Sequence, residues 1–230
     1  MNIAVVLAGG SGKRFGSPLP KQFLMLDGKT VIEHSIDAFC LHPDIDEVAV
    51  VVHPDYRTTM QAIADKRQWS KLRQIIDGGK ERYESSLNAV RAFESHNSDT
   101  NLLLHDAARP FLTAEIIGRV TNALRDNIAV GVGIPSTDTI WEVNNGVINH
   151  IPERRLMWLA QTPQAFRIDV LREAWQRALE DPCFSATDDC GVLVKYMPEI
   201  KIAVVEGSER NIKITTPGDI RRAEMLINER

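Results

Sequence analysis

Two basic residues follow a glycine cluster near the start of the chain, in the stretch LAGGSGKRFGSPLPK. Glycines directly after a short apolar run let the backbone turn sharply, and successive N–H groups there can form a concave anion site. Arg14 and Lys21 come next, with Pro18 and Pro20 restricting the backbone between them. Two cations beside a phosphate cradle could neutralise charge that develops at a phosphorus centre. The stretch therefore predicts a catalytic phosphate site, and the simpler alternative is a pair of solvated surface cations.

Two familiar phosphate-binding motifs do not fit this stretch. A Walker A loop needs Ser or Thr after Gly-Lys, but Gly12-Lys13 is followed by Arg14, and the required earlier glycine falls on Leu7. The dinucleotide fingerprint G-x-G-x-x-G begins at Gly10 but ends on Phe15. A glycine-rich turn alone is weak support for ligand binding, because many α/β proteins use one for tight packing. The cations that follow it strengthen the hypothesis.

Short apolar runs alternate with segments of helical spacing along the chain. Such alternation predicts an α/β fold, with a parallel or mixed sheet and helices on both faces. The runs that predict buried strands are 3–7, 48–52, 102–105, 130–134 and 202–205. The segments that predict helices are 31–41, 56–69, 81–95, 114–126, 168–179 and 219–229. No internal repeat or long linker divides the chain, so we expect one domain over residues 1–230.

One segment, TDTIWEVNNGVINHIP, interrupts this alternation. Its Asn145-Gly146 pair can adopt the positive φ angles of a tight hairpin turn. The flanking runs carry a set of apolar side chains that an isolated hairpin cannot bury: Trp141, Val143, Val147 and Ile151. The hairpin either folds back on its own sheet or forms an arm, over residues 138–158, that packs on a second subunit. We favour the arm because the segment breaks an otherwise regular pattern.

Composition narrows the class of protein. The formal net charge of -4 makes a surface-wide basic field for nucleic acid unexpected. Cys40, Cys183 and Cys190 are widely spaced and show neither a CxxC pair nor zinc-ligand spacing, so reduced thiols are expected. No apolar stretch approaches the roughly 20 residues that span a bilayer, and the start MNIAVVLAGG does not match a signal peptide. We expect a cytoplasmic protein with no nucleic-acid or membrane partner.

Several motifs together resemble one enzyme family. LAGGSGKRFGSPLPKQF, DGGKERYESSLNAV, HDAARPF, QTPQAF, TDD and NIKITTP occur in the order found in the cytidylyltransferases that act on sugar-alcohol phosphates. The resemblance runs from Ile3 to about Glu224, and HDAARPF and QTPQAF are its most specific parts. It implies a Rossmann-like, three-layer nucleotidyltransferase fold, with a homodimer joined through a β-hairpin arm. It also implies transfer of CMP from CTP to a phosphoalcohol, with release of pyrophosphate.

The resemblance assigns roles to individual positions. Arg14 and Lys21 match the cations that stabilise the transition state. The stretch that would hold CTP consists of Leu7, Ala8, Gly9 and Gly10. The positions that match contacts to cytosine and ribose are Gly79, Lys80 and Ser85. By itself, the segment DGGKERYES would be interpreted as an ordinary turn and helix start.

Asp106 and Arg109 follow a predicted strand, where ligands of open α/β sheets bind. The resemblance suggests that Asp106 orients the substrate or reaches a Mg²⁺ ion held mainly by the triphosphate, while Arg109 grips a phosphate or hydroxyl. The alternative is a local ion pair worth less than about 1 kcal/mol.

Other matching positions surround the expected phosphoalcohol: Thr139, Arg154, Thr162, Thr187 and Lys213. Arg154 and Lys213 would hold the attacking phosphate, and Arg155 is an equally basic alternative to Arg154. Because Arg154 lies beside the hairpin, Thr139 and Arg154 could serve the partner's site. Lys213 alternates with Ile212 and Ile214, which predicts a strand with the lysine on the opposite face.

The acceptor has two candidates. The segments RRLMWLAQTPQAF and ATDD favour 2-C-methyl-D-erythritol 4-phosphate, whereas LAGG, PLPKQF and TDDCG favour ribitol 5-phosphate. We prefer the first as the commoner family activity. A non-catalytic nucleotide-binding domain is the rival from another class, but it would not need the cations Arg14, Lys21 and Lys213.

Overall fold

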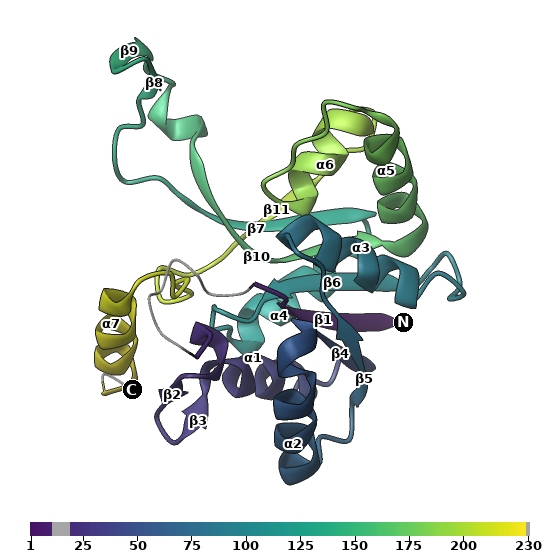
Figure 1. Cartoon of the computed structure of the whole chain (residues 1–230). Helices are drawn as coiled ribbons and strands as arrows, with labels where there is room; N and C mark the ends of the chain where they lie inside the picture. Colours follow the sequence, from purple (N-terminus) through teal and green to yellow (C-terminus); the bar gives the residue numbers. More distant parts are fainter. Residues whose placement is uncertain (11–18, 229–230) are drawn as a thin grey trace.

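The structure is a computed structural model that describes residues 1–10 and 19–228 (Figure 1). A seven-stranded sheet with the order β11-β7-β10-β6-β1-β4-β5 forms its centre. Only β10 runs antiparallel to its neighbours, β6 and β7. The strands are β1 (Asn2–Ala8), β4 (Glu47–Val52), β5 (Leu72–Asp77), β6 (Asn101–Asp106), β7 (Ala129–Pro135), β10 (Trp158–Arg167) and β11 (Ala203–Glu206). The predicted mostly parallel α/β sheet is confirmed.

Helices cover both faces of the sheet because its strands are apolar on both sides. Along β1, Ala4, Val6 and Ala8 enter one core cluster, whereas Ile3, Val5 and Leu7 enter the other. The helices of the first cluster are α1 (Val31–Cys40), α2 (Arg57–Arg67) and α4 (Ala114–Ala123). Those of the second are α3 (Arg82–Ala92), α5 (Ile168–Glu180) and α6 (Asp189–Tyr196). The three layers predicted from the family resemblance are therefore present.

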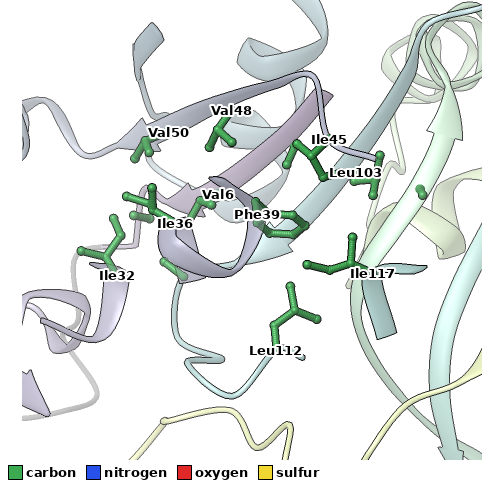
Figure 2. Close-up of a cluster of buried hydrophobic side chains, with 14 of the residues drawn as sticks. Val6, Ile32, Ile36, Phe39, Ile45, Val48, Val50, Leu103, Leu112 and Ile117 are labelled. Atoms are coloured by element: carbon green, nitrogen blue, oxygen red, sulfur yellow. The ribbon is translucent and has the colours of Figure 1, made fainter. Parts of the chain in front are cut away.

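Helix α1 shows how local sequence places a core helix. Thr30 precedes it, and the Glu33 carboxylate accepts a 2.6 Å hydrogen bond from the Thr30 N–H, which satisfies a backbone donor at the helix start. Ile36 and Phe39 then face the sheet and are completely buried against residues such as Val6 (Figure 2). Burial of each such side chain contributes about 1.5–3 kcal/mol. This packing fixes α1 against the sheet.

The last helix, α7 (Pro217–Asn228), lies away from these two layers. It packs with a small apolar cluster that includes Leu26, Val31 and Phe111. Leu26 belongs to a short ribbon formed by β2 (Met25–Leu26) and β3 (Lys29–Thr30). None of the helices in the described ranges is long and apolar enough to cross a membrane.

Some elements differ from the predictions. Sequence analysis did not predict the strands β5 and β10 or the helix α6. In β5, polar residues interrupt the apolar run. β10 contains Pro163, and proline normally argues against an interior strand. The register between β10 and β7 shifts between Gln161 and Ala165, which accommodates the proline. The strand predicted around Lys213 is wrong, since Ile212–Ile214 lie outside the sheet. Its alternation is nevertheless confirmed, because Ile212 and Ile214 pack in the α7 cluster while Lys213 contacts Asp106.

The predicted hairpin is confirmed in β8 (Glu142–Asn144) and β9 (Val147–His150). Asn145 and Gly146 have φ angles of 50° and 79°, as a tight turn between twisted strands requires. The hairpin forms a separate two-stranded sheet and projects away from the central sheet (Figure 1). It does not fold back on its own sheet, so its apolar side chains stay exposed in the single chain. We call residues 138–158 the arm.

Candidate active site

The glycine cluster and Asp106 meet at one edge of the sheet. β1 and β6 are parallel neighbours, and Leu7 pairs with Asp106 in their register. The carboxyl ends of both strands therefore lie together, at the edge where ligands of open α/β sheets bind. Gly9 and Gly10 follow directly after β1. The structure therefore brings the glycine cluster and Asp106 together.

Gly9 packs tightly against the start of α3. A Cβ atom at Gly9 would lie only 2.2 Å from the Ser85 hydroxyl, so this approach requires glycine. The same hydroxyl accepts a 3.3 Å hydrogen bond from the Gly79 N–H. The structure thus brings together Gly9, Gly79 and Ser85, which the resemblance assigned to one nucleotide site. Lys80 is exposed in the same turn, and its N–H donates to the Glu84 carboxylate.

A glutamine that the sequence analysis did not single out supports the same loop. The Gln22 side-chain nitrogen donates to the Ala8 carbonyl at 2.9 Å and to the Gly10 carbonyl at 3.0 Å. Gln22 is buried, and it belongs to the 3-10 turn Lys21–Phe23. The turn that carries Lys21 is thereby joined to the glycine loop. Arg14, the other predicted transition-state cation, lies outside the described residues.

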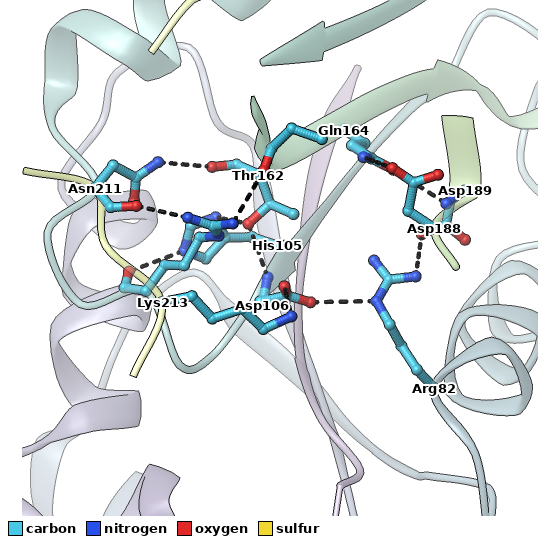
Figure 3. A network of polar contacts seen from close by, with 11 residues as sticks. Arg82, His105, Asp106, Thr162, Gln164, Asp188, Asp189, Asn211 and Lys213 are labelled. Carbon is cyan, nitrogen blue, oxygen red and sulfur yellow. Dashed lines mark hydrogen bonds and ion pairs between the residues drawn. The ribbon is translucent and has the colours of Figure 1, made fainter. Parts of the chain in front are cut away.

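Asp106 lies between two cations (Figure 3). Its Oδ2 is 2.6 Å from Lys213 Nζ, and its Oδ1 is 3.3 Å from Arg82 Nε. Burial alone would raise the pKa of Asp106, but attraction to Arg82 and Lys213 holds this pKa well below its usual range. The carboxylate is therefore charged at neutral pH. Lys213, which the resemblance placed at the phosphoalcohol, is brought to the expected edge.

Arg82 connects Asp106 to a second, fully buried carboxylate. Its Nη1 donates to Asp189 Oδ2 at 2.9 Å (Figure 3). Burial raises the pKa of Asp189, although Arg82 pulls it in the opposite direction. The four residues Arg82, Asp106, Asp189 and Lys213 form what we call the Asp106 cluster. Sequence reasoning missed Arg82 and Asp189, although both stand in motifs that resemble the family, because nothing in the sequence shows that α3 and α6 meet there.

Thr162 and His105 hold the backbone around Asp106. The His105 Nε2 lies 3.1 Å from the Arg109 carbonyl, which can only accept, so Nε2 carries the proton. Burial lowers the pKa of His105 to about 4, so the ring is neutral and Nδ1 accepts from the Thr162 hydroxyl at 3.0 Å. That hydroxyl in turn accepts from the Asp106 N–H at 3.1 Å. Thr162 is thus a buried support of the site, and its predicted substrate contact stays a prediction.

Arg109 is used inside the chain in this structure. Its Nη1 donates to the Asn211 carbonyl at 2.6 Å, and its Nη2 donates to the Ala160 carbonyl at 3.2 Å. These bonds join the loop after β6 to β10 and to the segment that carries Lys213. The predicted grip of Arg109 on a substrate phosphate stays a prediction.

Thr139, Arg154 and Thr187 are exposed and are not brought into the Asp106 cluster. Thr139 and Arg154 belong to the arm, where Arg154 Nη1 lies 3.4 Å from the Thr137 carbonyl. Arg155 pairs with Glu153, which distinguishes the two neighbouring arginines. Thr187 lies just before Asp188, the residue that caps α6. The predicted substrate contacts of these three residues stay predictions.

The chain is similar to known proteins along nearly its whole length. A family model described as 2-C-methyl-D-erythritol 4-phosphate cytidylyltransferase matches residues 2–229. A Thermobifida fusca protein with that name is 43% identical, over 97% of this chain and 92% of its own length. A Haemophilus influenzae bifunctional ribulose 5-phosphate reductase/CDP-ribitol pyrophosphorylase is 40% identical, over 100% of this chain and 48% of its own length.

Solved structures show the same fold. The crystal structure of 4-diphosphocytidyl-2C-methyl-D-erythritol synthase from Anaerococcus prevotii superposes with a TM-score of 0.87 at 28% identity, covering 99% of this chain and 98% of that chain. The corresponding cytidylyltransferase from Thermus thermophilus gives a TM-score of 0.77 at 28% identity, covering 99% and 100%. The likeness therefore includes the whole chain rather than the sheet alone.

Proposed function

Because the chain belongs to the 2-C-methyl-D-erythritol 4-phosphate cytidylyltransferase family, we propose that it transfers CMP from CTP to 2-C-methyl-D-erythritol 4-phosphate and releases pyrophosphate. The observation that carries this proposal is the meeting of the glycine loop, Asp106 and Lys213 at one edge of the sheet. This edge holds both an anion cradle and the charges that a phosphoryl transfer needs.

The chemistry follows from the substrates. A phosphate oxygen of the acceptor attacks the α-phosphorus of CTP, a new P–O bond forms, and the bond to the β-phosphate breaks so that pyrophosphate leaves. No general base is required, because the attacking phosphate is already an anion. The protein must align the two phosphates and stabilise the negative charge that accumulates between them.

The residues can be given roles in that reaction. The backbone N–H groups of the glycine loop hold the triphosphate, and Gly79, Lys80 and Ser85 contact the nucleoside. Arg14 and Lys21 stabilise the charge at the α-phosphorus. Lys213 and Arg154 hold the attacking phosphate in line. These roles are supported by the family match and by the positions of the glycine loop, Lys21 and Lys213.

We propose that a Mg²⁺ ion accompanies the triphosphate. Within residues 1–10 and 19–228, no group of three His, Cys, Asp or Glu side chains could hold a metal by itself. Mg²⁺ commonly binds one or two carboxylates together with substrate phosphates and waters. Asp106 would be its protein ligand, and the ion would supply neutralisation of the triphosphate charge.

We also propose that the arm joins two chains into a homodimer. The arm leaves many large apolar side chains exposed: Trp141, Val143, Val147, Ile148, Ile151, Leu156 and Trp158. Val147, for instance, is 69% exposed at the hairpin. An apolar surface of this kind is stabilised by burial against a second copy. Thr139 and Arg154 would then reach the partner's site. The cytoplasmic location stays a prediction.

Ribitol 5-phosphate is the second candidate acceptor, because about half of the bifunctional H. influenzae ribulose 5-phosphate reductase/CDP-ribitol pyrophosphorylase matches this whole chain. The test is pyrophosphate release with CTP, ATP, UTP and GTP against each of the two acceptors. We expect turnover with CTP and 2-C-methyl-D-erythritol 4-phosphate. Preference for ribitol 5-phosphate would replace only the acceptor. Absence of turnover with CTP and either acceptor would contradict the proposed function.

A further inference from the structure

The QTPQ segment of β10 contains two buried glutamines that the proposed reaction does not use. Gln161 is 5% exposed and Gln164 is 3% exposed. A buried side-chain amide needs partners for its two N–H donors and its oxygen, so its hydrogen bonds indicate what it holds in place. Gln161 is the last residue before the register shift in β10, Gln164 lies within the shift, and the two amides contact different segments.

Gln161 binds the segment that leads to Lys213. Its Nε2 donates to the Ser208 carbonyl at 2.8 Å, and its Oε1 accepts from the Ser208 N–H at 3.3 Å. The same oxygen accepts from Asn211 Nδ2 at 3.2 Å. A Cβ atom at Gly207 would lie 2.2 Å from this oxygen, so the close approach requires glycine. The Gln161 amide thus forms both a donor and an acceptor hydrogen bond with the backbone of Ser208, as a residue of a neighbouring strand could.

The held segment ends at the cation beside Asp106. Asn211 is completely buried, and its Nδ2 also donates to the Thr162 carbonyl at 3.0 Å. Two residues later, Lys213 Nζ lies 2.6 Å from Asp106 Oδ2. No regular element contains residues 207–214. The Ile214 N–H donates to the Ala108 carbonyl at 2.8 Å and so holds the segment beyond Lys213. On the other side of Lys213, the contacts of Gln161 with Ser208 and Asn211 help to fix the backbone.

Gln164 makes an analogous set of bonds on the other side of the strand. Its Oε1 accepts from the Asp189 and Cys190 N–H groups at 3.0 and 3.1 Å, and its Nε2 donates to Asp188 Oδ2 at 2.7 Å (Figure 3). It thereby holds the start of α6, whose Asp189 binds Arg82. Gln164 does not contact the segment that carries Lys213, which makes it a matched control for Gln161.

We propose that Gln161 is a positioning residue that sets the location of the Lys213 ammonium through Ser208 and Asn211. This inference rests on the proposed function only for the role of Lys213 at the attacking phosphate. A lysine side chain is long and flexible, so a fixed backbone origin limits the volume that its charge samples. A displacement of about 1 Å in a positioned group can cost roughly 10²-fold in rate.

A double-mutant cycle tests the inference with the full-length protein. Gln161→Met retains volume and removes the polar contacts, and it is made in the wild type and in Lys213→Met. We expect kcat/KM for the acceptor to fall about 10- to 100-fold in the wild type, and by about 2-fold or less once Lys213 is absent. KM for CTP should stay near its wild-type value, because Gln161 does not touch the glycine loop. Gln164→Met should lose a similar factor in both backgrounds.

An equal loss from Gln161→Met in both backgrounds would overturn the inference, because a purely structural role does not depend on Lys213. If Gln161→Met does not fold, Gln161→Asn replaces it, since the uncharged amide is retained but is one methylene too short to keep the same contacts with Ser208 and Asn211. This variant should also lose more kcat/KM when Lys213 is present than when it is replaced. An equal loss in both backgrounds would overturn the inference.

Amide hydrogen exchange separates this inference from the proposed function. Gln161→Met should accelerate exchange in residues 208–213, whereas Gln164→Met should accelerate it in residues 188–191. These measurements need no substrate, so they remain decisive if the wild type shows no turnover, an outcome that contradicts the proposed function alone. Unchanged exchange in residues 208–213 would overturn the assignment of Gln161.

Discussion

The Asp106 cluster and the arm differ in what surrounds their side chains. Within the cluster, Asp106 and Asp189 are buried, and each carboxylate pairs with a cation of the same chain. In the arm, every residue of β8 and β9 is exposed, including Val143 and Val147. The cluster is complete within one chain, whereas the arm leaves apolar surface in contact with water. In the homodimer that we propose, the cluster would need no residue of the partner to pair its charges, whereas the arm would bury its apolar side chains against the partner.

The largest effect should come from Lys21 and Arg14, the two cations proposed to stabilise the transition state. Lys21→Ala should lower kcat by about 10²–10³-fold, because a charge that stabilises the transition state is lost without disturbing the core. Arg14→Ala should behave similarly. Pyrophosphate release measures the rate, circular dichroism checks the fold, and exposed Lys201→Ala is the matched control. Near-normal turnover of Lys21→Ala would remove its assigned role and weaken the distinction between the two regions.

The neighbouring arginines at the base of the arm test whether that region takes part in the chemistry. Arg154→Gln should lower kcat/KM for the acceptor about 10²-fold if it holds the attacking phosphate. Arg155→Gln should change it by about 2-fold or less, because the exposed pair of Arg155 with Glu153 is worth less than about 1 kcal/mol. Steady-state kinetics of both variants measure which arginine contributes to kcat/KM for the acceptor. A larger loss for Arg155→Gln would reverse the assignment.

The arm itself should control self-association. Val147→Glu places a charge on the surface proposed to be buried, so it should raise the dimer dissociation constant by about 10-fold or more. Leu41→Glu, at a residue that is 83% exposed outside the arm, should leave it unchanged. Sedimentation over a concentration series measures both variants. A monomeric wild type, or unaltered association of Val147→Glu, would mean that the exposed arm has no partner in a second copy.

The smallest expected effect concerns the support beneath Asp106. His105 has a pKa of about 4 when folded, against 6.5 for an unperturbed histidine, so between these values only the unfolded chain takes up the proton. The free energy of unfolding should therefore decrease as the pH falls through this window, by at most about 1.4 kcal/mol per pH unit from this residue. Asp106 adds a further loss as the pH falls through 3.8, where its unfolded form becomes protonated.

Urea unfolding at pH 7 and at pH 4.5 measures this dependence. His105→Gln removes the titrating ring, so the free energy of unfolding should change less between pH 7 and pH 4.5. Lys201→Ala provides the comparison, because Lys201 is exposed and its replacement leaves His105 buried. An unchanged slope in His105→Gln would show that another group dominates the acid response.

Local patterns accounted for much of the fold. Apolar runs predicted β1, β4, β6, β7 and β11, and helical spacing predicted α1 to α5 and α7 to within a few residues. The Asn145-Gly146 turn predicted the hairpin because few residue pairs adopt two positive φ angles. β10 was missed because Pro163 contradicts a strand locally, whereas the pairing of β10 with β6 and β7 tolerates it through a register shift.

By itself, the sequence determined the α/β class, the glycine turn after β1 and the residues that could hold phosphates, because these depend on local backbone preferences and side-chain chemistry. Only the tertiary structure decided which of them meet. Arg82, Asp106, Asp189 and Lys213 come from four separate parts of the chain, and their contacts exist because the sheet order and the packing of α3 and α6 bring them together. The same packing made Thr162 and Arg109 supports of the site, because burial surrounded them with the chain's own polar groups.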